Sequence, residues 1–426
     1  MRLPVTIAAR RDRHALLALL ALIAPALLPV PCLAQTEPPS PSQAREWCLG
    51  QGKFSDDQKI AGCTAVLNAK ATSKEKSDAY LARGAAYLGK EDVDRAIADF
   101  SALIKRDPSY EAALANRGEA YRRKGDPERA VADLNRAIEL DPKDAAAWCN
   151  RGIAYDDLGD RDHAIVDYTR AIRLNPDDPW YYNNRGNSYG AKNDYQHALA
   201  DYNQAIKLDP KFALAHYNRG TGYREHGETD LALIDLDLSI RLDPTYGPAY
   251  GNRARIWRDK GDKPRAFADF EKSLELNPGN DRDFCARADM YFDQHNYVQA
   301  LADYDGSIKA DASYSGTFNA RCMTRAILGQ LQEALADCEQ SLRMRPNDPY
   351  TLDSRAFCHL KLGNLDAAIA DYDAALQAQP KLESALYGRS IAKRRKGDGD
   401  GAERDLAAAK AIRPDIAGEF AHYGVE

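Results

Sequence analysis

The chain has 426 residues, of which 44% are hydrophobic and 29% are charged, and its formal net charge at pH 7 is −6. Because the first 34 residues carry four Arg and one Asp, the rest of the chain has a net charge of about −9. Phosphate binding needs clustered Lys and Arg, so this acidic balance argues against nucleic acid as a partner.

Residues 1–34 have the composition of a secretory signal peptide. Four Arg precede position 14, the stretch Ala15–Val30 is almost wholly apolar, and small residues lead up to Ala34. The apolar stretch is about 16 residues long, whereas a membrane-spanning helix needs about 20. We therefore expect cleavage after Ala34, a secreted or periplasmic protein, and no transmembrane segment in the mature chain. Retention of the segment as an anchor is the alternative.

Two short segments precede the main body of the chain. Residues 35–43 are rich in Pro and Ser, which is typical of a linker. Residues 44–76 resemble a degenerate helical hairpin, with Trp47 and Cys48 in a first helix and Ile60–Leu67 in a second. Terminal repeats of a stack are often atypical because they cover its end, so we expect an N-terminal capping repeat.

Ten copies of a 34-residue unit then run without a gap from Ser77 to Ile416. In the copy Glu111–Asp144, apolar and small residues recur at helical spacing in two stretches. The first stretch ends at Gly125, and Asp141-Pro142 ends the second. Each unit is thus predicted to be a helix, a short turn and a second helix, stacked on its neighbours.

The repeated residues define a family pattern. The second helix of every copy carries Ala at one position, opposite a small residue of the first helix. The segment Asn184–Tyr189, followed by Ala198–Tyr202 and Asp209-Pro210, resembles the tetratricopeptide repeat (TPR). The resemblance covers residues 77–416. It implies an all-α, right-handed superhelical solenoid of antiparallel helix pairs, whose first helices line a concave groove.

One departure from the usual TPR pattern is systematic. The first-helix position that is usually Leu is Arg in all ten copies, and every second helix has Asp just before its aromatic position. A partly buried Arg requires a carboxylate partner. We predict Arg–Asp pairs, within repeats or between neighbours, that fix the register rather than bind a ligand. The residues are Arg83, Arg117, Arg151, Arg185, Arg219, Arg253, Arg287, Arg321, Arg355 and Arg389, with Asp99, Asp133, Asp167, Asp201, Asp235, Asp269, Asp303, Asp337, Asp371 and Asp405.

The groove is the expected place for a ligand. Positions two, five, nine and twelve of each first helix share one face, and position six borders it. Position six is Asn in five successive copies, and an amide can pair with a peptide bond as donor and acceptor. The row resembles the asparagine ladder of some TPR grooves; hydrogen bonding to the neighbouring helix is the alternative. Its members are Asn116, Asn150, Asn184, Asn218 and Asn252.

Aromatic and Arg residues gather over the same copies. Trp180 and Tyr217 offer aromatic surface, and Arg224, Arg255 and Arg258 add positive charge. Aromatic residues together with Arg are typical of interface hot spots. We therefore expect the recognition centre within residues 179–260, with a solvated face of mixed charge as the alternative.

The cysteines favour two disulfides, which export permits. Cys48 and Cys63 are 15 residues apart, and Cys322 and Cys338 are 16 apart, each pair joining the two helices of one hairpin. Cys358, in the next first helix, competes for Cys338. Cys149 and Cys285 are expected to be small apolar fillers of the groove face.

Residues 417–426, with Phe420 and Tyr423, are long enough for a short C-terminal capping segment. No phosphate-binding loop, nucleophile motif or cluster with metal-ligand spacing is apparent in the sequence. We therefore expect no enzyme activity, no metal or cofactor and no small-molecule substrate.

The sequence thus predicts a non-catalytic periplasmic scaffold that binds an extended peptide or protein segment in its concave groove. The alternative is a structural subunit of a cell-envelope secretion or polysaccharide-export complex, docking through its convex face or its ends.

Overall fold

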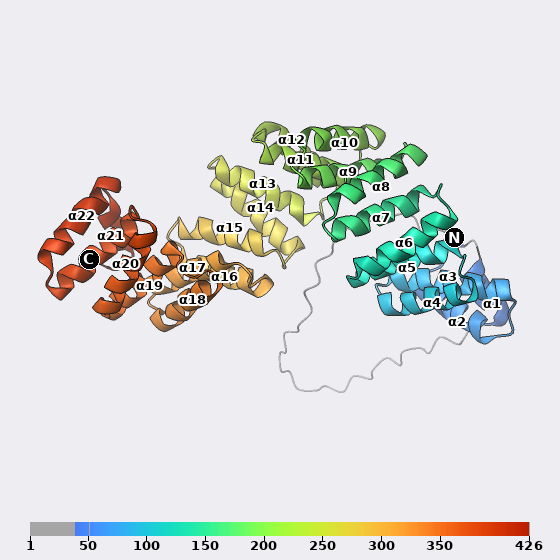
Figure 1. The fold of residues 1–426 in the computed structure, drawn as a ribbon, viewed down its shortest axis with the longest axis horizontal. Helices are drawn as coiled ribbons and strands as arrows, with labels where there is room; N and C mark the ends of the chain where they lie inside the picture. Colours follow the sequence, from blue (N-terminus) through green and yellow to red (C-terminus); the bar gives the residue numbers. More distant parts are fainter. Residues whose placement is uncertain (1–38, 51, 426) are drawn as a thin grey trace, which may run out of the picture. The chain divides into compact units, whose positions relative to one another are not determined.

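The computed structural model describes residues 39–50 and 52–425, which are all-α, with no strand among them (Figure 1). The predicted signal peptide and residues 35–38 of the predicted linker lie outside the described residues. The described chain forms two compact units. Unit 1 ends at Asp243, and unit 2 begins at Pro244.

Unit 1 consists of six helical hairpins. Its helices are α1 (Pro41–Leu49), α2 (Asp56–Asn68), α3 (Ser73–Gly89), α4 (Val93–Arg106), α5 (Glu111–Lys124), α6 (Pro127–Leu140), α7 (Ala145–Asp157), α8 (Arg161–Leu174), α9 (Pro179–Ala191), α10 (Tyr195–Leu208), α11 (Ala213–Glu225) and α12 (Thr229–Leu242). The first, α1 with α2, is the predicted capping hairpin. It begins earlier than predicted, because Ser40 accepts a hydrogen bond from the Gln43 amide and starts α1 at Pro41.

Unit 2 consists of five hairpins and one further helix. Its helices are α13 (Gly247–Asp259), α14 (Lys263–Leu276), α15 (Asp281–Phe292), α16 (Tyr297–Ala310), α17 (Ser315–Ile327), α18 (Leu331–Met344), α19 (Pro349–Leu362), α20 (Leu365–Ala378), α21 (Glu383–Lys396), α22 (Gly399–Ile412) and α23 (Ile416–His422). The ten predicted repeats correspond to the pairs from α3–α4 to α21–α22, which confirms an all-α repeat solenoid.

Local sequence explains where these helices begin and end. Asp126 accepts a hydrogen bond from the Arg129 amide at the start of α6, and Asp160 does the same for the His163 amide at the start of α8. Gly125 has a φ of 85°, the left-handed conformation that glycine adopts easily at a helix end. The turn between the two helices of a repeat is therefore encoded within it.

Small residues set the spacing within each hairpin. The recurring second-helix Ala is buried in every repeat, as at Ala130 and Ala164. A Cβ placed on Gly186 would lie 2.7 Å from the ring of Tyr202 on α10. The first helix must therefore stay small where the aromatic side chain of the second helix crosses it.

The Arg–Asp pairs form within repeats. Of the two arrangements predicted, within repeats or between neighbours, the structure has the first. In all ten copies the guanidinium donates from Nε and Nη2 to both oxygens of the Asp sixteen residues later, at 2.5 to 2.8 Å. In several copies Nη1 also reaches the preceding second helix, as from Arg185 to Thr169. Each such Arg joins three helices of two repeats.

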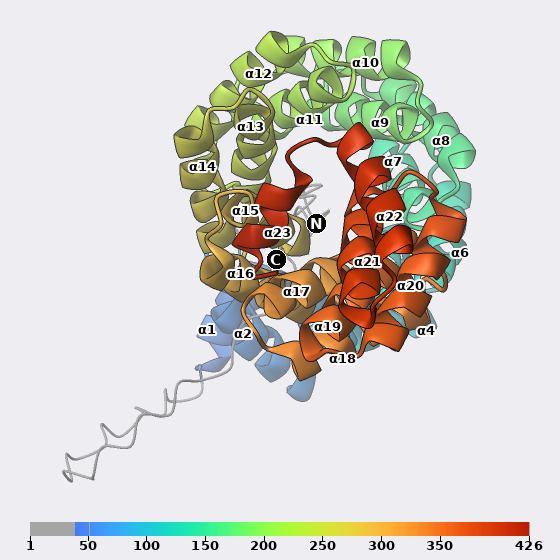
Figure 2. The same ribbon diagram turned by 90° about the vertical axis from the view of Figure 1, so that its left-hand side faces the viewer.

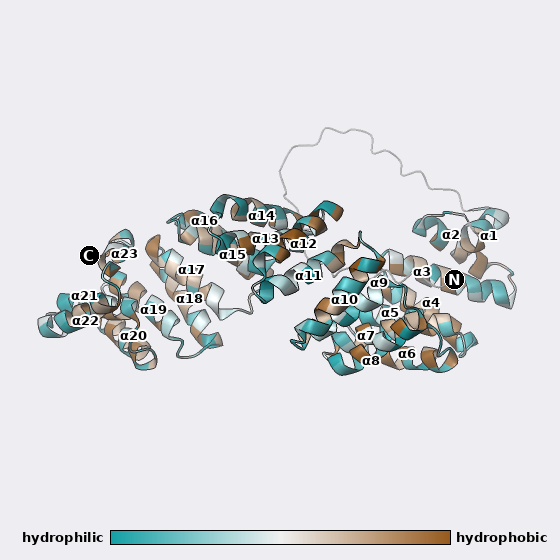
Figure 3. Ribbon diagram, turned by 90° about the horizontal axis from the view of Figure 1, so that it is seen from above, coloured by the Kyte–Doolittle hydropathy of each residue, from teal (hydrophilic) through white to brown (hydrophobic). Residues whose placement is uncertain are grey.

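The helices are amphipathic, and hydrophobic and hydrophilic residues alternate along them (Figure 3). Among the described helices, none combines the length and the apolar character needed to cross a membrane.

Candidate functional site

The first helices of the repeats share one face of each unit. In unit 1 the first helix of a repeat contacts the first helix of the next, as α5 contacts α7 and α7 contacts α9. In unit 2, α17 contacts α19 and α19 contacts α21 in the same way. In Figure 2, α7 and α9 of unit 1 lie on the inner side of α8 and α10, and α15 and α17 of unit 2 lie on the inner side of α16 and α18. We call the inner side the first-helix face.

The Asn row lies largely within the packing of the first helices. Asn184 is buried and its Nδ2 lies 3.7 Å from Cys149 Sγ, whereas Asn218 donates to Asn183 Oδ1 at 2.9 Å. Asn116 is also buried. Asn150 and Asn252 are half-buried. At least Asn116 and Asn184 therefore do not lie open to a ligand, and the bonds to the neighbouring helix match the alternative interpretation of the row.

The predicted aromatic and Arg residues are also engaged inside the fold. Trp180 packs on Phe212, with ring centroids 4.5 Å apart. Arg255 pairs at 2.6 Å with Asp283, which is fully buried. The predicted recognition centre, residues 179–260, is divided at Asp243, so that Arg255 and Arg258 belong to unit 2.

The remaining predicted Arg residues of the groove have acidic side chains as neighbours. Arg258 pairs with its neighbour Asp259 at 3.0 Å, and Arg224 lies 3.7 Å from Glu225. Tyr217 and Arg224 are half-buried. Within each unit these Arg side chains therefore have an acidic neighbour, as expected for a solvated face of mixed charge.

A hollow on the first-helix face lies in unit 2, over α17, α19 and α21. It is a cavity of about 280 Å³. Nine of its lining residues come from first helices, at the positions predicted to face or border the groove: Phe292, Asn319, Ala320, Met323, Tyr350, Asp353, Ser354, Phe357 and Ser384. The first-helix part of the lining thus occupies the positions predicted to face the groove. The predicted recognition centre, residues 179–260, lies in other repeats.

Two polar groups of this cavity, a carboxyl group with a raised pKa and a buried amide oxygen, differ from ordinary surface groups. Burial raises the pKa of Asp353 to about 7, although Ser384 donates a hydrogen bond to its carboxylate at 2.6 Å. Nearby Glu383 and Glu419 raise that pKa further. Asn319 Oδ1 is buried with no hydrogen-bond partner among the described residues. The cavity thus combines aromatic walls with a carboxyl group that is partly protonated near neutral pH and an amide oxygen that can accept a hydrogen bond.

Asp353 makes the stability of unit 2 depend on pH. Its pKa in the folded chain, about 7, lies above the ordinary value of 3.8, so folding disfavours the ionised form. Its contribution to stability is therefore greatest below pH 3.8 and falls as the pH rises to about 7.

We expect Asp353→Asn to raise stability by about 1–3 kcal/mol at pH 8 and by almost nothing at pH 4, because the amide stays neutral. Thermal unfolding followed by circular dichroism across this range measures the difference. The exposed Asp400→Asn serves as the control. A difference between wild type and Asp353→Asn that is constant with pH would contradict the shifted pKa.

The C-terminal helix α23 closes one side of the cavity. Glu419, Phe420 and Tyr423 belong to its lining. The sequence predicted a short helix at residues 417–426 but gave no indication that it would lie on the first-helix face.

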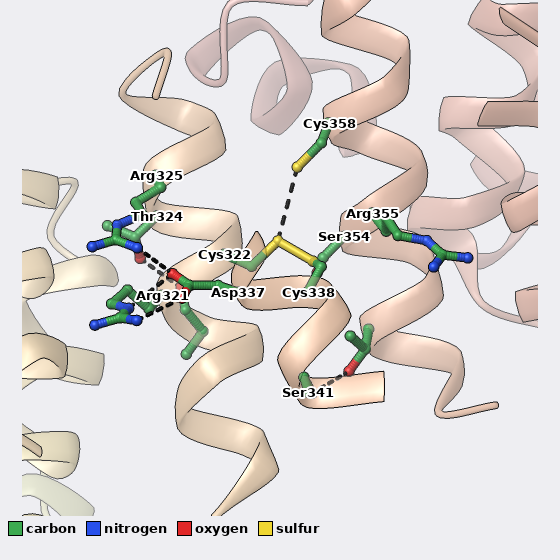
Figure 4. Close-up of a disulfide and its surroundings, with 12 residues drawn as sticks. Arg321, Cys322, Thr324, Arg325, Asp337, Cys338, Ser341, Ser354, Arg355 and Cys358 are labelled. Carbon is green, nitrogen blue, oxygen red and sulfur yellow. Dashed lines mark hydrogen bonds and ion pairs between the residues drawn. A yellow bond between two sulfur atoms is a disulfide. The ribbon is translucent and has the colours of Figure 1, made fainter. Parts of the chain in front are cut away.

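Both expected disulfides are present: Cys48 is bonded to Cys63, and Cys322 to Cys338. Figure 4 shows Cys358 pointing from α19 toward the second disulfide, with its Sγ 3.8 Å from Cys322 Sγ. Among the described residues, these last three cysteines are the one group close enough to share a metal ion, and two of them are oxidised.

Family models match several parts of the chain. A model described as "TPR repeat" matches residues 118–159 and 186–227. Models described as "Tetratricopeptide repeat" match residues 77–110, 145–178, 167–200, 247–280 and 328–394. Together these matches cover more than half of the chain. None of the curated proteins matches it significantly.

Solved structures of helical repeat proteins are similar. A monomeric mutant of IFIT1 with m7Gppp-AAAA is 17% identical, with 76% of each chain covered and a TM-score of 0.50. A tetratricopeptide repeat protein from Parabacteroides merdae ATCC 43184 is 20% identical over 59% of this chain and 99% of its own, with a TM-score of 0.49. MamA is 26% identical over 37% of this chain and 93% of its own, with a TM-score of 0.34. At these values, the likeness to the IFIT1 structure supports the fold alone.

Proposed function

Because the chain belongs to the tetratricopeptide repeat family, we propose that it is a non-catalytic scaffold that binds a protein or peptide on the first-helix face of unit 2. The observation that carries this proposal is the cavity over α17, α19 and α21, which is lined from the groove positions of four successive repeats, α15 to α21. Its aromatic walls and few polar groups suit an apolar side chain of a partner.

We further propose that the protein acts in the periplasm. Residues 1–34 have the composition of an export signal, and two disulfides are compatible with an oxidising compartment.

The alternative, docking through the outer side, has one observation in its favour. Large apolar side chains are exposed on second helices: Val166 on α8, Ile234 on α12 and Val298 on α16 are 62–67% exposed. Singly exposed apolar residues are common on soluble proteins, so this evidence is weaker than a lined cavity.

Affinity capture from the cell-envelope fraction, quantified by mass spectrometry, distinguishes the two modes. Tyr350 is 53% exposed at the cavity, so Tyr350→Ala should leave the fold intact and lower the amount of bound partner about tenfold or more. Val298→Ser, on the second helix α16, and Tyr314→Ala, an exposed aromatic outside the cavity, serve as matched controls within unit 2. Loss of the partner with Val298→Ser and not with Tyr350→Ala would instead support docking through the outer side.

A further inference from the structure

The position of α23 departs from the repeat pattern. In a regular stack each first helix packs on the second helix before it, as α21 packs on α20. By contrast, α23 packs mainly on α21, and Figure 2 shows it on the side of α21 away from α22. The chain turns back after Arg413 and places its last helix on the first-helix face of its own unit.

Aromatic contacts hold α23 in this position. The ring of Phe420 packs edge-on against two other rings. Its centroid lies 4.7 Å from that of Tyr387 on α21 and 5.8 Å from that of Phe357 on α19. Tyr423 contacts Phe357 at 5.9 Å. Phe420 and Tyr423 are only 3% and 8% exposed. The two aromatic residues, three positions apart on one helix, bury the same side of α23 in the groove.

Polar contacts extend the docked segment across several repeats. Lys361 Nζ on α19 donates to the Tyr423 carbonyl oxygen at 3.0 Å. The ring of His422 stacks on that of His295, which follows α15, with centroids 4.9 Å apart. The segment therefore reaches from α21 to the end of α15, as a bound ligand helix would.

Two features make this occupant replaceable. The helix α23 has seven residues and no side-chain hydrogen bond at its N-cap, so its order depends on the groove. It also leaves the cavity of about 280 Å³ beside Phe420, where Asn319 Oδ1 has no partner among the described residues. A ligand with a bulkier side chain and a hydrogen-bond donor at this point would make contacts that α23 does not make.

We propose that the first-helix face of α15–α21 binds a short amphipathic helix of a partner protein, with two aromatic residues three positions apart. In this proposal α23 is the internal occupant that the partner displaces. It rests on the proposed function, and it specifies a helical partner segment instead of the extended one predicted from the sequence. A tethered segment has an effective concentration in the millimolar range, so α23 raises the threshold for partner binding.

The test uses a fluorescently labelled peptide with the sequence of residues 413–426 and the full chain, with binding followed by anisotropy. In wild type the peptide competes with the tethered α23. Phe420→Ala loosens that segment and leaves the groove unchanged, so the peptide should bind this variant at least tenfold more tightly than wild type. Tyr314→Ala should bind like wild type, because Tyr314 is 64% exposed and outside the cavity. A peptide with Ala at the positions of Phe420 and Tyr423 should not bind.

Hydrogen exchange shows separately whether α23 is docked. The amides of Tyr423 and Val425 are bonded to Glu419 and Phe420 carbonyls, so they should exchange slowly in wild type and faster in Phe420→Ala, with other helices unchanged. Equal peptide affinity for wild type and Phe420→Ala, absence of binding to both, or wild-type exchange at the rate of the free peptide would overturn the proposal. The proposed function is tested separately by affinity capture. If Tyr350→Ala loses the envelope partner, the proposed function holds even where one of these results overturns the role of α23.

Discussion

Replacing Arg185 with Ala is expected to lower the free energy of unfolding of unit 1 by about 3–5 kcal/mol. Arg185 donates two hydrogen bonds to Asp201, and the two side chains are only 18% and 8% exposed. Without the guanidinium, the Asp201 carboxylate stays buried with no opposite charge. Because Nη1 also holds Thr169 of the preceding repeat, the substitution weakens two repeats together.

Urea unfolding followed by circular dichroism measures this loss. The pair Lys192–Asp162 provides the control, since its side chains are 41% and 80% exposed and Lys192→Ala should cost about 0–1 kcal/mol. The double variant Arg185→Leu, Asp201→Ala should recover most of the loss, because it removes both charges and restores an apolar contact. Equal effects of Arg185→Ala and Lys192→Ala would contradict the structural role assigned to the buried pairs.

Loss of the second disulfide is expected to have an effect of similar size, unless Cys358 replaces the missing cysteine in a new bridge. Cys322–Cys338 closes a loop of 16 residues, and such a bridge contributes about 3 kcal/mol. Cys322→Ala leaves Cys338 and Cys358, whose sulfur atoms lie within 4.8 Å of each other, so only the double variant Cys322→Ala, Cys358→Ala leaves no bridge at this place. Cys338→Ala leaves Cys322 beside Cys358, with their sulfur atoms 3.8 Å apart, so oxidation can link α17 to α19 instead.

Melting temperatures and mass mapping of disulfides test this difference. Under oxidising conditions the double variant Cys322→Ala, Cys358→Ala should be less stable than Cys338→Ala, and under reducing conditions this difference should largely disappear. Burial raises the pKa of Cys358 to about 12, so in wild type its thiol should remain free. A Cys322–Cys358 bond in native wild type, or equal stability of Cys338→Ala and the double variant when oxidised, would contradict this expectation.

The repeat period made much of the fold predictable. Each helix and its partner lie within 34 residues, so the Arg–Asp pairs and both disulfides join positions whose spacing is fixed by the hairpin. The groove positions were predictable for the same reason: Asn319 and Asp353 both occupy position five of their repeats and both line the cavity.

Two features were not predictable from that spacing. The amides of Asn184 and Asn218 turn toward the preceding first helix, so these two side chains bond at the contact between neighbouring helices. The position of α23 depends on contacts between distant segments, such as Lys361 with Tyr423, 62 residues apart. A local pattern predicts that a short helix forms but does not say on which face it docks.

The measurement that tests the proposed binding site most directly is photo-crosslinking in the cell envelope. A photoreactive phenylalanine analogue replaces Tyr350 at the cavity in one protein and Val298 on α16 in another, and both positions are exposed. The proposed function predicts a discrete protein adduct from position 350 and none from position 298. An adduct from position 298 alone would place recognition on the outer side and contradict the assignment of the first-helix face as the binding site.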